Sequence, residues 1–355
     1  MTVVIVGAGV LGAALAQTFA RLGHEVTLVE QYELGDPRAA SSARSRILRI
    51  AHGADVADTR SAWRSRELWR ELECGTGTRL FTETGMAWFA PAGDSHWERE
   101  SVRVLGDEGI PVELLAPRDA LRLFPRLRVD DLDHVLLEPH GGLLHAREAT
   151  HALVQDALTS GARLLRGQAT PDEERVSIDG RYIEADRVVW ACGAWTPRLF
   201  PALVSGTVIQ QDVFYVEASG GWSSPPVPAW GEARRAVTGA GSLVGSGFKV
   251  GIDAPGPPFD LDGGARTPVA GHEAHARAYL RGRFPDIADA RLVHTETCQT
   301  VALETGLTEP TALLGGEVRL VQHPEHSDVW LLGDGSGHAF KHAPAIAEEV
   351  ARLLG

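Results

Sequence analysis

Cysteine is scarce in this sequence, which contains three cysteines among its 355 residues. Cys74, Cys192 and Cys298 are too few and too scattered for a disulfide framework or a structural zinc site. The sequence therefore predicts free thiols, a reducing compartment and no metal centre.

Long apolar runs and an excess of positive charge are also lacking. No apolar stretch reaches the roughly 18 residues of a membrane-spanning helix, and no basic region precedes the N-terminal apolar stretch, unlike a signal peptide. Asp and Glu number 47 against 34 for Lys and Arg, so the formal net charge is −13. Such a chain repels phosphate backbones and anionic membrane surfaces. We therefore expect a cytoplasmic protein that binds neither nucleic acid nor membranes.

The residues that are present include the full pattern of a dinucleotide-binding βαβ unit at the N-terminus. Thr2–Val6 predicts a buried strand, Ala13–Leu22 a helix and His24–Val29 a second strand. The turn after the first strand is Gly7-Ala8-Gly9-Val10-Leu11-Gly12, and Glu30 follows the second strand.

Each glycine of this turn, and the acid that follows it, has a physical role. Gly7 makes the tight turn, Gly9 lets the backbone approach a pyrophosphate, and Gly12 lets the helix pack closely on the strand. The helix N-terminus offers N–H groups and a positive dipole end to the phosphates. Glu30 accepts from ribose hydroxyls and disfavours a 2′-phosphate. An accidental glycine cluster is the alternative, and the complete strand–turn–helix–strand context argues against it.

Elements of the same type recur in separated parts of the chain. Further helices are predicted at Ser61–Glu73, Ala146–Ser160 and His272–Phe284 and from near Pro344, and further buried strands at Asp186–Cys192 and Val329–Leu332. We predict an α/β fold with two discontinuous domains. Residues 1–78, 142–205 and 297–355 form the Rossmann-like dinucleotide domain, and residues 79–141 and 206–296 form a mixed-sheet substrate domain.

Two features favour FAD over NAD as the dinucleotide. An NAD enzyme usually completes its sheet with a second mononucleotide half, whereas here the Arg-rich segment Ser41–His52 and mixed strands intervene. The glycine-rich strand-to-helix turn at residues 333–337 also suits a flavin ring, because a helix N-terminus stabilises the negative charge that the ring gains on reduction.

Several motifs resemble the monomeric sarcosine oxidase branch of the FAD-dependent amine oxidases, in the same order and through nearly the whole chain. They are the segments 41–53, 66–73, 188–196, 247–251, 297–298, 323–326 and 335–341. The resemblance implies that Cys298 forms a thioether to the flavin, that Lys249 lies where O2 reacts, and that Arg49 and Lys341 grip the substrate carboxylate.

The resemblance, together with the N-terminal turn, yields a set of candidate site residues. The candidate catalytic residues are Lys249, Arg49, Lys341, Arg46 and Asp253. The candidate cofactor contacts are Gly7, Gly9, Val10, Leu11, Gly12, Glu30, Ser41, Ser42, Ser45, Arg46, Gly193, Trp195, Cys298, Asp334, Gly335, Gly337, His338 and Lys341.

The sequence also departs from the family pattern. Asp253 stands where sarcosine oxidase has a pocket histidine, Thr238 lies near the position of an active-site tyrosine, and Ala54 replaces a loop glutamate. Gly335 replaces a phenylalanine in the tail. Sarcosine itself is therefore a doubtful substrate, and an acid at Asp253 indicates contact with a polar or cationic nitrogen.

Each assignment has a plainer alternative. Cys298 is otherwise a buried structural thiol, Lys249 a solvated strand lysine, and Asp253 a turn residue. Arg46 and Arg49 are three residues apart, so on a helix they would share a face and form a surface basic patch. Of the two residues assigned to the substrate carboxylate, Lys341 has the weaker sequence signal.

The resemblance implies a monomeric FAD-dependent oxidase of a secondary or cyclic amino acid, with a carboxylate-bearing amine and O2 as its small-molecule partners. A hydride from the carbon beside nitrogen would pass to the flavin, and O2 would become hydrogen peroxide. The alternatives are a flavin dehydrogenase with another electron acceptor, a non-catalytic flavin-binding protein and an NAD dehydrogenase.

Overall fold

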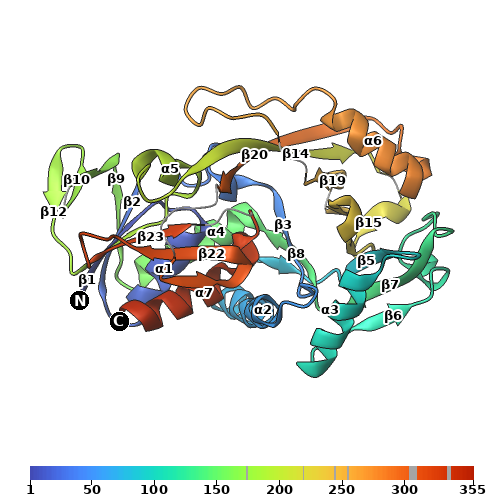
Figure 1. Ribbon diagram of the computed structural model, residues 1–355, viewed down its shortest axis with the longest axis horizontal. Helices are drawn as coiled ribbons and strands as arrows, with labels where there is room; N and C mark the ends of the chain where they lie inside the picture. Colours follow the sequence, from blue (N-terminus) through green and yellow to red (C-terminus); the bar gives the residue numbers. More distant parts are fainter. Residues whose placement is uncertain (173–174, 219, 244, 254–255, 304–309, 334–336) are drawn as a thin grey trace.

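The computed structural model describes residues 1–172, 175–218, 220–243, 245–253, 256–303, 310–333 and 337–355. The predicted cofactor contacts Asp334 and Gly335 lie outside these residues. Two large sheets lie side by side along the longest axis of the molecule (Figure 1). Both chain termini lie at the end that holds the seven-stranded sheet.

The seven-stranded sheet has the strand order β21-β22-β23-β13-β1-β2-β9. Its strands are β1 (Thr2–Val6), β2 (Glu25–Glu30), β9 (Arg163–Arg166), β13 (Arg187–Trp190), β21 (Ala312–Leu314), β22 (Val318–Gln322) and β23 (Val329–Gly333). The pairs from β23 to β9 are parallel, while β21 and β22 add an antiparallel edge. Strand β1 is apolar and buried from Val3 to Val6, as expected for a parallel strand that is covered on both faces.

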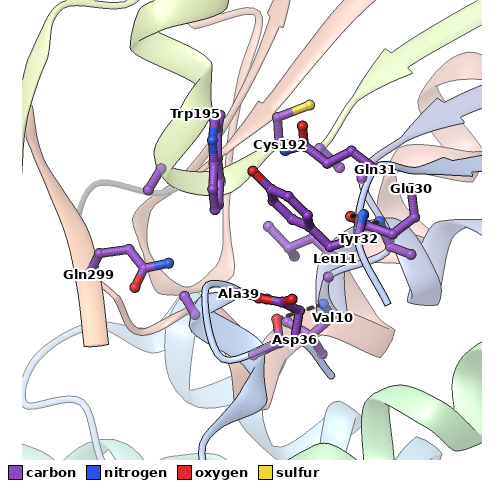
Figure 2. A pocket seen from close by; sticks show the side chains of 18 of the residues that line it. Val10, Leu11, Glu30, Gln31, Tyr32, Asp36, Ala39, Cys192, Trp195 and Gln299 are labelled. Carbon is purple, nitrogen blue, oxygen red and sulfur yellow. Dashed lines mark hydrogen bonds between the residues drawn. The ribbon is translucent and has the colours of Figure 1, made fainter. Parts of the chain in front are cut away.

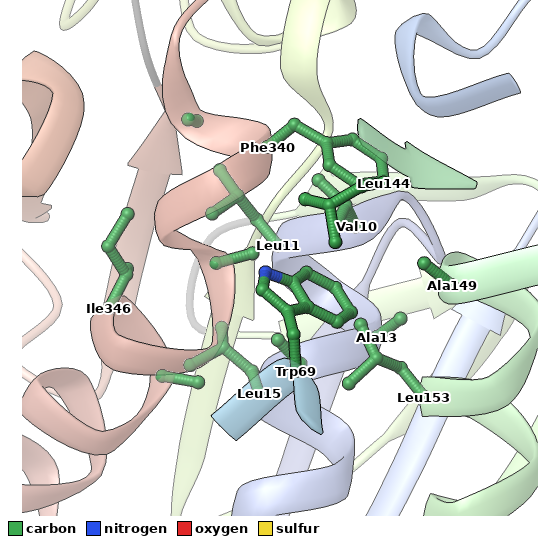
Figure 3. Packing of buried hydrophobic residues seen from close by; sticks show 14 of the residues in the cluster. Val10, Leu11, Ala13, Leu15, Trp69, Leu144, Ala149, Leu153, Phe340 and Ile346 are labelled. Carbon is green, nitrogen blue, oxygen red and sulfur yellow. The ribbon is translucent and has the colours of Figure 1, made fainter. Parts of the chain in front are cut away.

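Helices from distant parts of the chain pack together against this sheet. They are α1 (Val10–Arg21), α2 (Val56–Thr76), α4 (Ala146–Thr159) and α7 (Ala339–Leu354). Figure 3 shows Trp69 of α2 between Leu15 of α1, Leu153 of α4 and Phe340 of α7. The fully buried Trp69 ring lies 6.0 Å from the Phe340 ring in a stacked arrangement. The start of α7 is therefore fixed against α1 and α2.

The predicted start of the last helix near Pro344 is wrong, because α7 begins at Ala339 and Pro344 lies inside it. Proline removes a helical hydrogen bond, and side chains of α2 supply partners beside the break. Trp69 Nε1 donates to the carbonyl of Lys341 at 3.0 Å, and the N–H of Ala345 donates to Ser65 Oγ at 3.3 Å. Packing therefore outweighs the local preference of proline.

The eight-stranded sheet is mixed and has the strand order β20-β14-β19-β17-β16-β5-β7-β6. Its strands are β5 (Met86–Pro91), β6 (Glu113–Leu115), β7 (Leu132–Glu138), β14 (Gly206–Val216), β16 (Ala229–Glu232), β17 (Val237–Ala240), β19 (Phe248–Ile252) and β20 (Leu292–Leu303). Helices α3 (His96–Asp107) and α6 (His272–Arg283) lie near its ends (Figure 1). Because β20 continues this sheet to Leu303, the domain boundary near residue 297 stays a prediction.

Strand β19 has one face in an aromatic core and the other towards the site. Phe248 and Val250 are fully buried in a cluster that includes Trp230 and Phe284. Successive side chains of a strand point to opposite faces. Lys249, between Phe248 and Val250, therefore points away from the aromatic core.

A small three-stranded sheet connects the two large ones. It consists of β3 (Ser45–Leu48), β8 (Gly142–His145) and β4 (Phe81–Thr82) in the order β3-β8-β4. The segment with Arg46 is therefore a strand, so the helical relation considered for Arg46 and Arg49 does not apply. Both arginines are only half exposed, which also argues against a surface patch.

The remaining elements are peripheral. They are the sheet β10 (Ala169–Asp172), β11 (Arg175–Ile178) and β12 (Arg181–Ile183), the pair β15 (Ser223–Ser224) and β18 (Ser242–Leu243), and the helix α5 (Thr196–Leu199). The predicted helices at 146–160 and 272–284 agree with α4 and α6 to within one residue, whereas α2 starts one turn before the predicted Ser61. Within the described ranges, no helix has the length and apolar character needed to cross a bilayer.

Candidate active site

The turn after β1 has the close contacts that its glycines predict. Gly7 has φ +100°, and a Cβ there would lie 2.6 Å from the carbonyl oxygen of Ala191 on the neighbouring strand end. A Cβ on Gly12 would lie 1.8 Å from the carbonyl oxygen of Gly7. Both distances are far below van der Waals contact, so α1 packs this closely on β1 only with glycine at these positions.

The N-terminus of α1 and the end of β2 meet at this turn. The N–H of Val10 donates to Ser41 Oγ at 2.9 Å, which ties the turn to the Arg-rich segment. Glu30 accepts from the N–H of Ala8 at 2.8 Å and from the N–H of Tyr32 at 2.9 Å. The carboxylate of Glu30 is thus held at the edge of the turn, where its remaining lone pairs are available to ribose hydroxyls.

A pocket extends from this turn to Cys298. The predicted cofactor contacts that line it are Gly7, Gly9, Val10, Leu11, Glu30, Ser41, Arg46, Gly193, Trp195, Cys298 and Gly337. The other predicted contacts within the described part of the chain are not among its lining residues; they are Gly12, Ser42, Ser45, His338 and Lys341. Gly12 instead packs the helix onto the strand, as its predicted role requires.

Tyr32 and Gln299, which the sequence did not predict, also line the pocket (Figure 2). The rings of Tyr32 and Trp195 lie 6.0 Å apart on one side, and Gln299 projects from β20 on the other. The guanidinium of Arg38 lies 3.5 Å from the centre of the Tyr32 ring. Tyr32 comes two residues after Glu30, the predicted ribose contact, and this spacing was the available signal for it; Gln299 reaches the pocket from β20.

Lys249 is a buried lysine beside β3. Its side chain is 6% exposed, and its Nζ donates to the carbonyl of Ser45 at 2.8 Å and to Ser45 Oγ at 3.2 Å. Burial and the charge of Arg46 lower the pKa of Lys249 to about 8, although Glu296 and Cys298 act in the opposite direction. The alternative of a solvated strand lysine is therefore wrong.

Arg46 links this lysine to the cysteine. Its guanidinium donates to the carbonyl of Ala40 at 2.6 Å and lies 3.6 Å from the sulfur of Cys298. Cys298 lies on β20, opposite Gln211 of β14, and lines the pocket. The structure therefore brings Arg46, Lys249 and Cys298 together although they come from three different strands.

Tyr215 and Glu296 complete this group and were not anticipated. The Tyr215 hydroxyl donates to Glu296 Oε2 at 2.9 Å, and burial raises the pKa of Tyr215. Glu296 Oε1 accepts from the N–H of Arg44 at 3.0 Å. These two residues lie on paired strands with no local motif around them, so the sequence held no signal for them.

Arg49 lies just beyond β3, above a buried acid. Glu138 is fully buried and accepts from the N–H groups of Ile50 and Ala51 at 2.5 and 3.0 Å and from Trp88 Nε1 at 2.7 Å. Burial raises the pKa of Glu138, and Arg49 is among the groups that oppose this shift. Burial likewise lowers the pKa of Arg49, with the charge of Glu138 opposing. Glu138 thus fixes the backbone after Arg49 and partly compensates its charge.

Lys341 lies in the first turn of α7 and is 4% exposed. Its Nζ donates to the carbonyl of His338 at 3.3 Å. Burial and the charges of Lys341 and Arg49 together lower the pKa of His338 to about 3. Arg49, just beyond β3, and Lys341, at the start of α7, therefore both lower the pKa of His338 and lie near the same small region. Cations gathered away from water make a suitable place for an anion.

Asp253 follows β19 and lies near enough to Arg49 to be influenced by its charge. It is exposed, and its Oδ1 accepts from Gln211 Nε2 at 2.8 Å. Desolvation of the carboxylate by the surrounding protein raises the pKa of Asp253, while the Gln211 hydrogen bond and the charge of Arg49 oppose this shift. Of the other departures that fall within the described residues, Ala54 is exposed before α2 and Thr238 pairs with Gly251 in the sheet.

The pocket fits FAD in its chemistry. The turn, the helix N-terminus and Glu30 match a pyrophosphate and a ribose. The far end, with Arg46 and Cys298, offers a cation and a thiol to the reactive part of a longer ligand.

Comparisons with known proteins agree with this fit. A family model described as FAD dependent oxidoreductase matches residues 2–353. Monomeric sarcosine oxidase from Bacillus sp. (strain B-0618) is 27% identical over 366 residues, which cover 99% of this chain and 91% of that protein. The predicted resemblance to sarcosine oxidase is thereby confirmed.

Solved structures agree as well. L-proline dehydrogenase from P. horikoshii has a TM-score of 0.83 at 21% identity and covers 99% of this chain and 92% of its own. NikD, an amino acid oxidase essential for nikkomycin biosynthesis, has a TM-score of 0.76 at 24% identity, with 99% and 93% covered. These similarities confirm the predicted α/β fold class. Since the family model matches nearly the whole chain, this protein belongs to the FAD-dependent oxidoreductases.

Proposed function

We propose that this protein is an oxidase of a secondary or cyclic amino acid, which converts the amine to an imine and O2 to hydrogen peroxide. The observation that supports this proposal is the position of β3 and of the residue Arg49 just beyond it. Ser45 contacts Lys249, Arg46 contacts Cys298, and Arg49 shares its surroundings with Lys341. One short segment thus connects a candidate oxygen site, a flavin attachment point and an anion site.

The bound flavin supplies the two-electron acceptor for the C–H bond beside nitrogen. Arg49 and Lys341, here called the carboxylate clamp, hold the substrate carboxylate; Arg49 offers a planar fork and Lys341 a point charge. Holding the carboxylate in one place fixes the neighbouring carbon, and this orientation lowers the barrier for transfer.

Lys249 serves the second half of the reaction. Electron transfer to O2 creates negative charge on oxygen, and a buried ammonium stabilises that charge more strongly than water does. The contacts with Ser45 hold the ammonium in place before the charge develops. An oxygen-activating cation favours an oxidase over a dehydrogenase.

Asp253 faces the substrate nitrogen in this proposal. Gln211 orients the carboxylate, and Arg49 lies near enough to influence its pKa. A carboxylate at this position favours substrates with a polar amine nitrogen, such as N-methyl and cyclic amino acids.

A peroxide-coupled screen tests the function. The purified flavoprotein is mixed with sarcosine, proline, pipecolate and related cyclic amines, and peroxide is measured with and without catalase. We expect peroxide from at least one of them. Reduction of the flavin by a substrate without uptake of O2 would instead identify a dehydrogenase, and no spectral change with any carboxylate-bearing amine would contradict the proposal.

Cys298 attaches the flavin covalently in this proposal. We expect the yellow colour to stay with the protein after acid precipitation of the wild type and to appear in the supernatant after Cys298→Ser. Cys192 provides a matched control because it lines the same pocket. Burial raises the pKa of the Cys192 thiol, so it is a poor nucleophile, and Cys192→Ser should keep the colour in the pellet. Free flavin from the wild type would contradict the attachment.

A further inference from the structure

Three side chains with metal-binding chemistry lie beside the carboxylate clamp and have no part in the proposed reaction. His52 precedes α2, Asp58 lies in the first turn of α2, and His342 lies in the first turn of α7. One nitrogen of each histidine and one oxygen of Asp58 all lie within 4.8 Å of one another.

Both imidazoles are oriented by a hydrogen bond on their Nδ1 side. His52 Nδ1 lies 2.8 Å from the carbonyl oxygen of Ile50, which can only accept, so Nδ1 carries the hydrogen and Nε2 the lone pair. His342 Nδ1 lies 3.0 Å from Ser61 Oγ. Within the described ranges, both Nε2 atoms are buried without a hydrogen-bond partner. A buried polar atom without a partner is unfavourable, which indicates a ligand between the rings.

The donor set suits a divalent metal ion. Two imidazole nitrogens and one carboxylate oxygen occur at zinc sites and at other first-row metal sites, where further positions stay open to water. Metal-binding histidines usually donate their second N–H to a carbonyl or similar group. The contact between His52 and Ile50 has this form, and the ring centres of His52 and His342 are 5.3 Å apart.

The surroundings of the three side chains leave a path for a metal ion from solvent, but they also place positive charge nearby. Asp58 is half-buried, and Ala54, Asp55 and Ala57 beside it are exposed, so an ion can reach the group from solvent. Arg49 and Lys341 lie near enough to lower the pKa of both histidines, in addition to burial. These cations repel a metal ion, and Asp58 offsets part of that repulsion.

We propose that His52, Asp58 and His342 bind one divalent cation of the zinc class beside the carboxylate clamp. A carboxylate held by Arg49 and Lys341 cancels part of their charge, so the cation and the carboxylate ligand bind with positive coupling. By thermodynamic linkage, each tightens the other by the same factor.

The test measures metal binding in the flavin-loaded protein. The protein is dialysed against a chelator and then titrated with Zn²⁺, with bound metal measured after equilibrium dialysis. We expect one Zn²⁺ per chain and about 10- to 100-fold weaker binding after Asp58→Asn or His342→Phe. Asp58→Asn changes a half-buried position, so it keeps the test open if His342→Phe does not fold.

Two controls separate this site from other binding. Asp55→Asn removes an equal charge from the same helix start, where Asp55 caps the helix rather than facing the histidines, and it should leave the affinity unchanged. His326→Gln removes one of two stacked imidazoles, His323 and His326, whose ring centres are 4.8 Å apart and which could hold a metal. Loss of Zn²⁺ after His326→Gln, or its full retention after Asp58→Asn, would overturn the proposal.

Co²⁺ provides a second measurement, since ligation by the two imidazoles gives visible absorption bands that should disappear with His342→Phe. The coupling is tested by repeating the Zn²⁺ titration with an unreactive carboxylate, which should tighten binding. Neither measurement depends on turnover, so a failure of the proposed oxidase activity and a failure of this site are distinguishable.

Discussion

Replacing Lys249 with methionine will slow the reaction of the reduced protein with O2 by about 10²- to 10³-fold, the usual effect of removing one preorganised charge-stabilising donor. The buried ammonium beside Ser45 stabilises negative charge as it develops on oxygen, and methionine fills a similar volume without charge. Reduction by substrate should change only a few-fold. Stopped-flow absorbance measures the two half-reactions separately.

The pH dependence of the same step provides an independent readout. The pKa of Lys249 is lowered to about 8, so the side chain is charged below that pH and neutral above it. The rate of reaction with O2 should therefore fall as the pH rises through about 8, and Lys249→Met should remove this dependence. Equal slowing of both half-reactions in Lys249→Met would contradict the assigned role.

Lys341→Met is the matched control for that experiment. Lys341 is also a buried lysine, but it lies with Arg49 rather than with Ser45 and Cys298. We expect it to slow reduction by substrate and to leave the reaction with O2 nearly unchanged. The two lysine variants should thus affect opposite halves of the cycle.

Replacing Arg49 with methionine will lower kcat/KM for the amino acid substrate by about 10²- to 10³-fold. Removing one partner of a buried charge pair usually costs about 2–5 kcal/mol, and here the loss falls on the substrate carboxylate. Steady-state kinetics on the best substrate of the screen measures this effect. Arg49→Lys keeps the charge but not the planar fork, and it should recover only part of the loss.

Structural damage has to be distinguished from loss of the clamp, because Arg49 also compensates the buried Glu138. Thermal unfolding of Arg49→Met reports the structural part. Arg44→Met is the control, since the side chain of Arg44 is exposed and lies 3.8 Å from the carboxylate of Glu296, a distance at which an ion pair is weak. Unchanged affinity of Arg49→Met for carboxylate ligands would rule out the clamp.

The N-terminal unit shows which features can be predicted from a sequence. The turn from Gly7 to Gly12 is largely local, since a Cβ on Gly12 would lie 1.8 Å from the carbonyl oxygen of Gly7, although Gly7 itself also packs against Ala191. The buried strands β1 and β13 were equally clear, because parallel strands covered on both faces read as continuous apolar runs.

The errors have a common cause in contacts between distant residues. Pro344 indicated a helix start, yet α2 and α1 hold α7 in helical form five residues earlier. The spacing of Arg46 and Arg49 was considered on a helix, yet pairing with β8 makes the segment a strand.

The sequence by itself determined the dinucleotide unit, the α/β class and, through its motifs, the family. Only the tertiary structure decided that Tyr215 meets Glu296, that Glu138 lies under Arg49, and that His52 faces His342. Motifs record geometry between residues a few bonds apart. A site built from different strands and helices depends on how those elements pack, and packing depends on shape and burial along the whole chain.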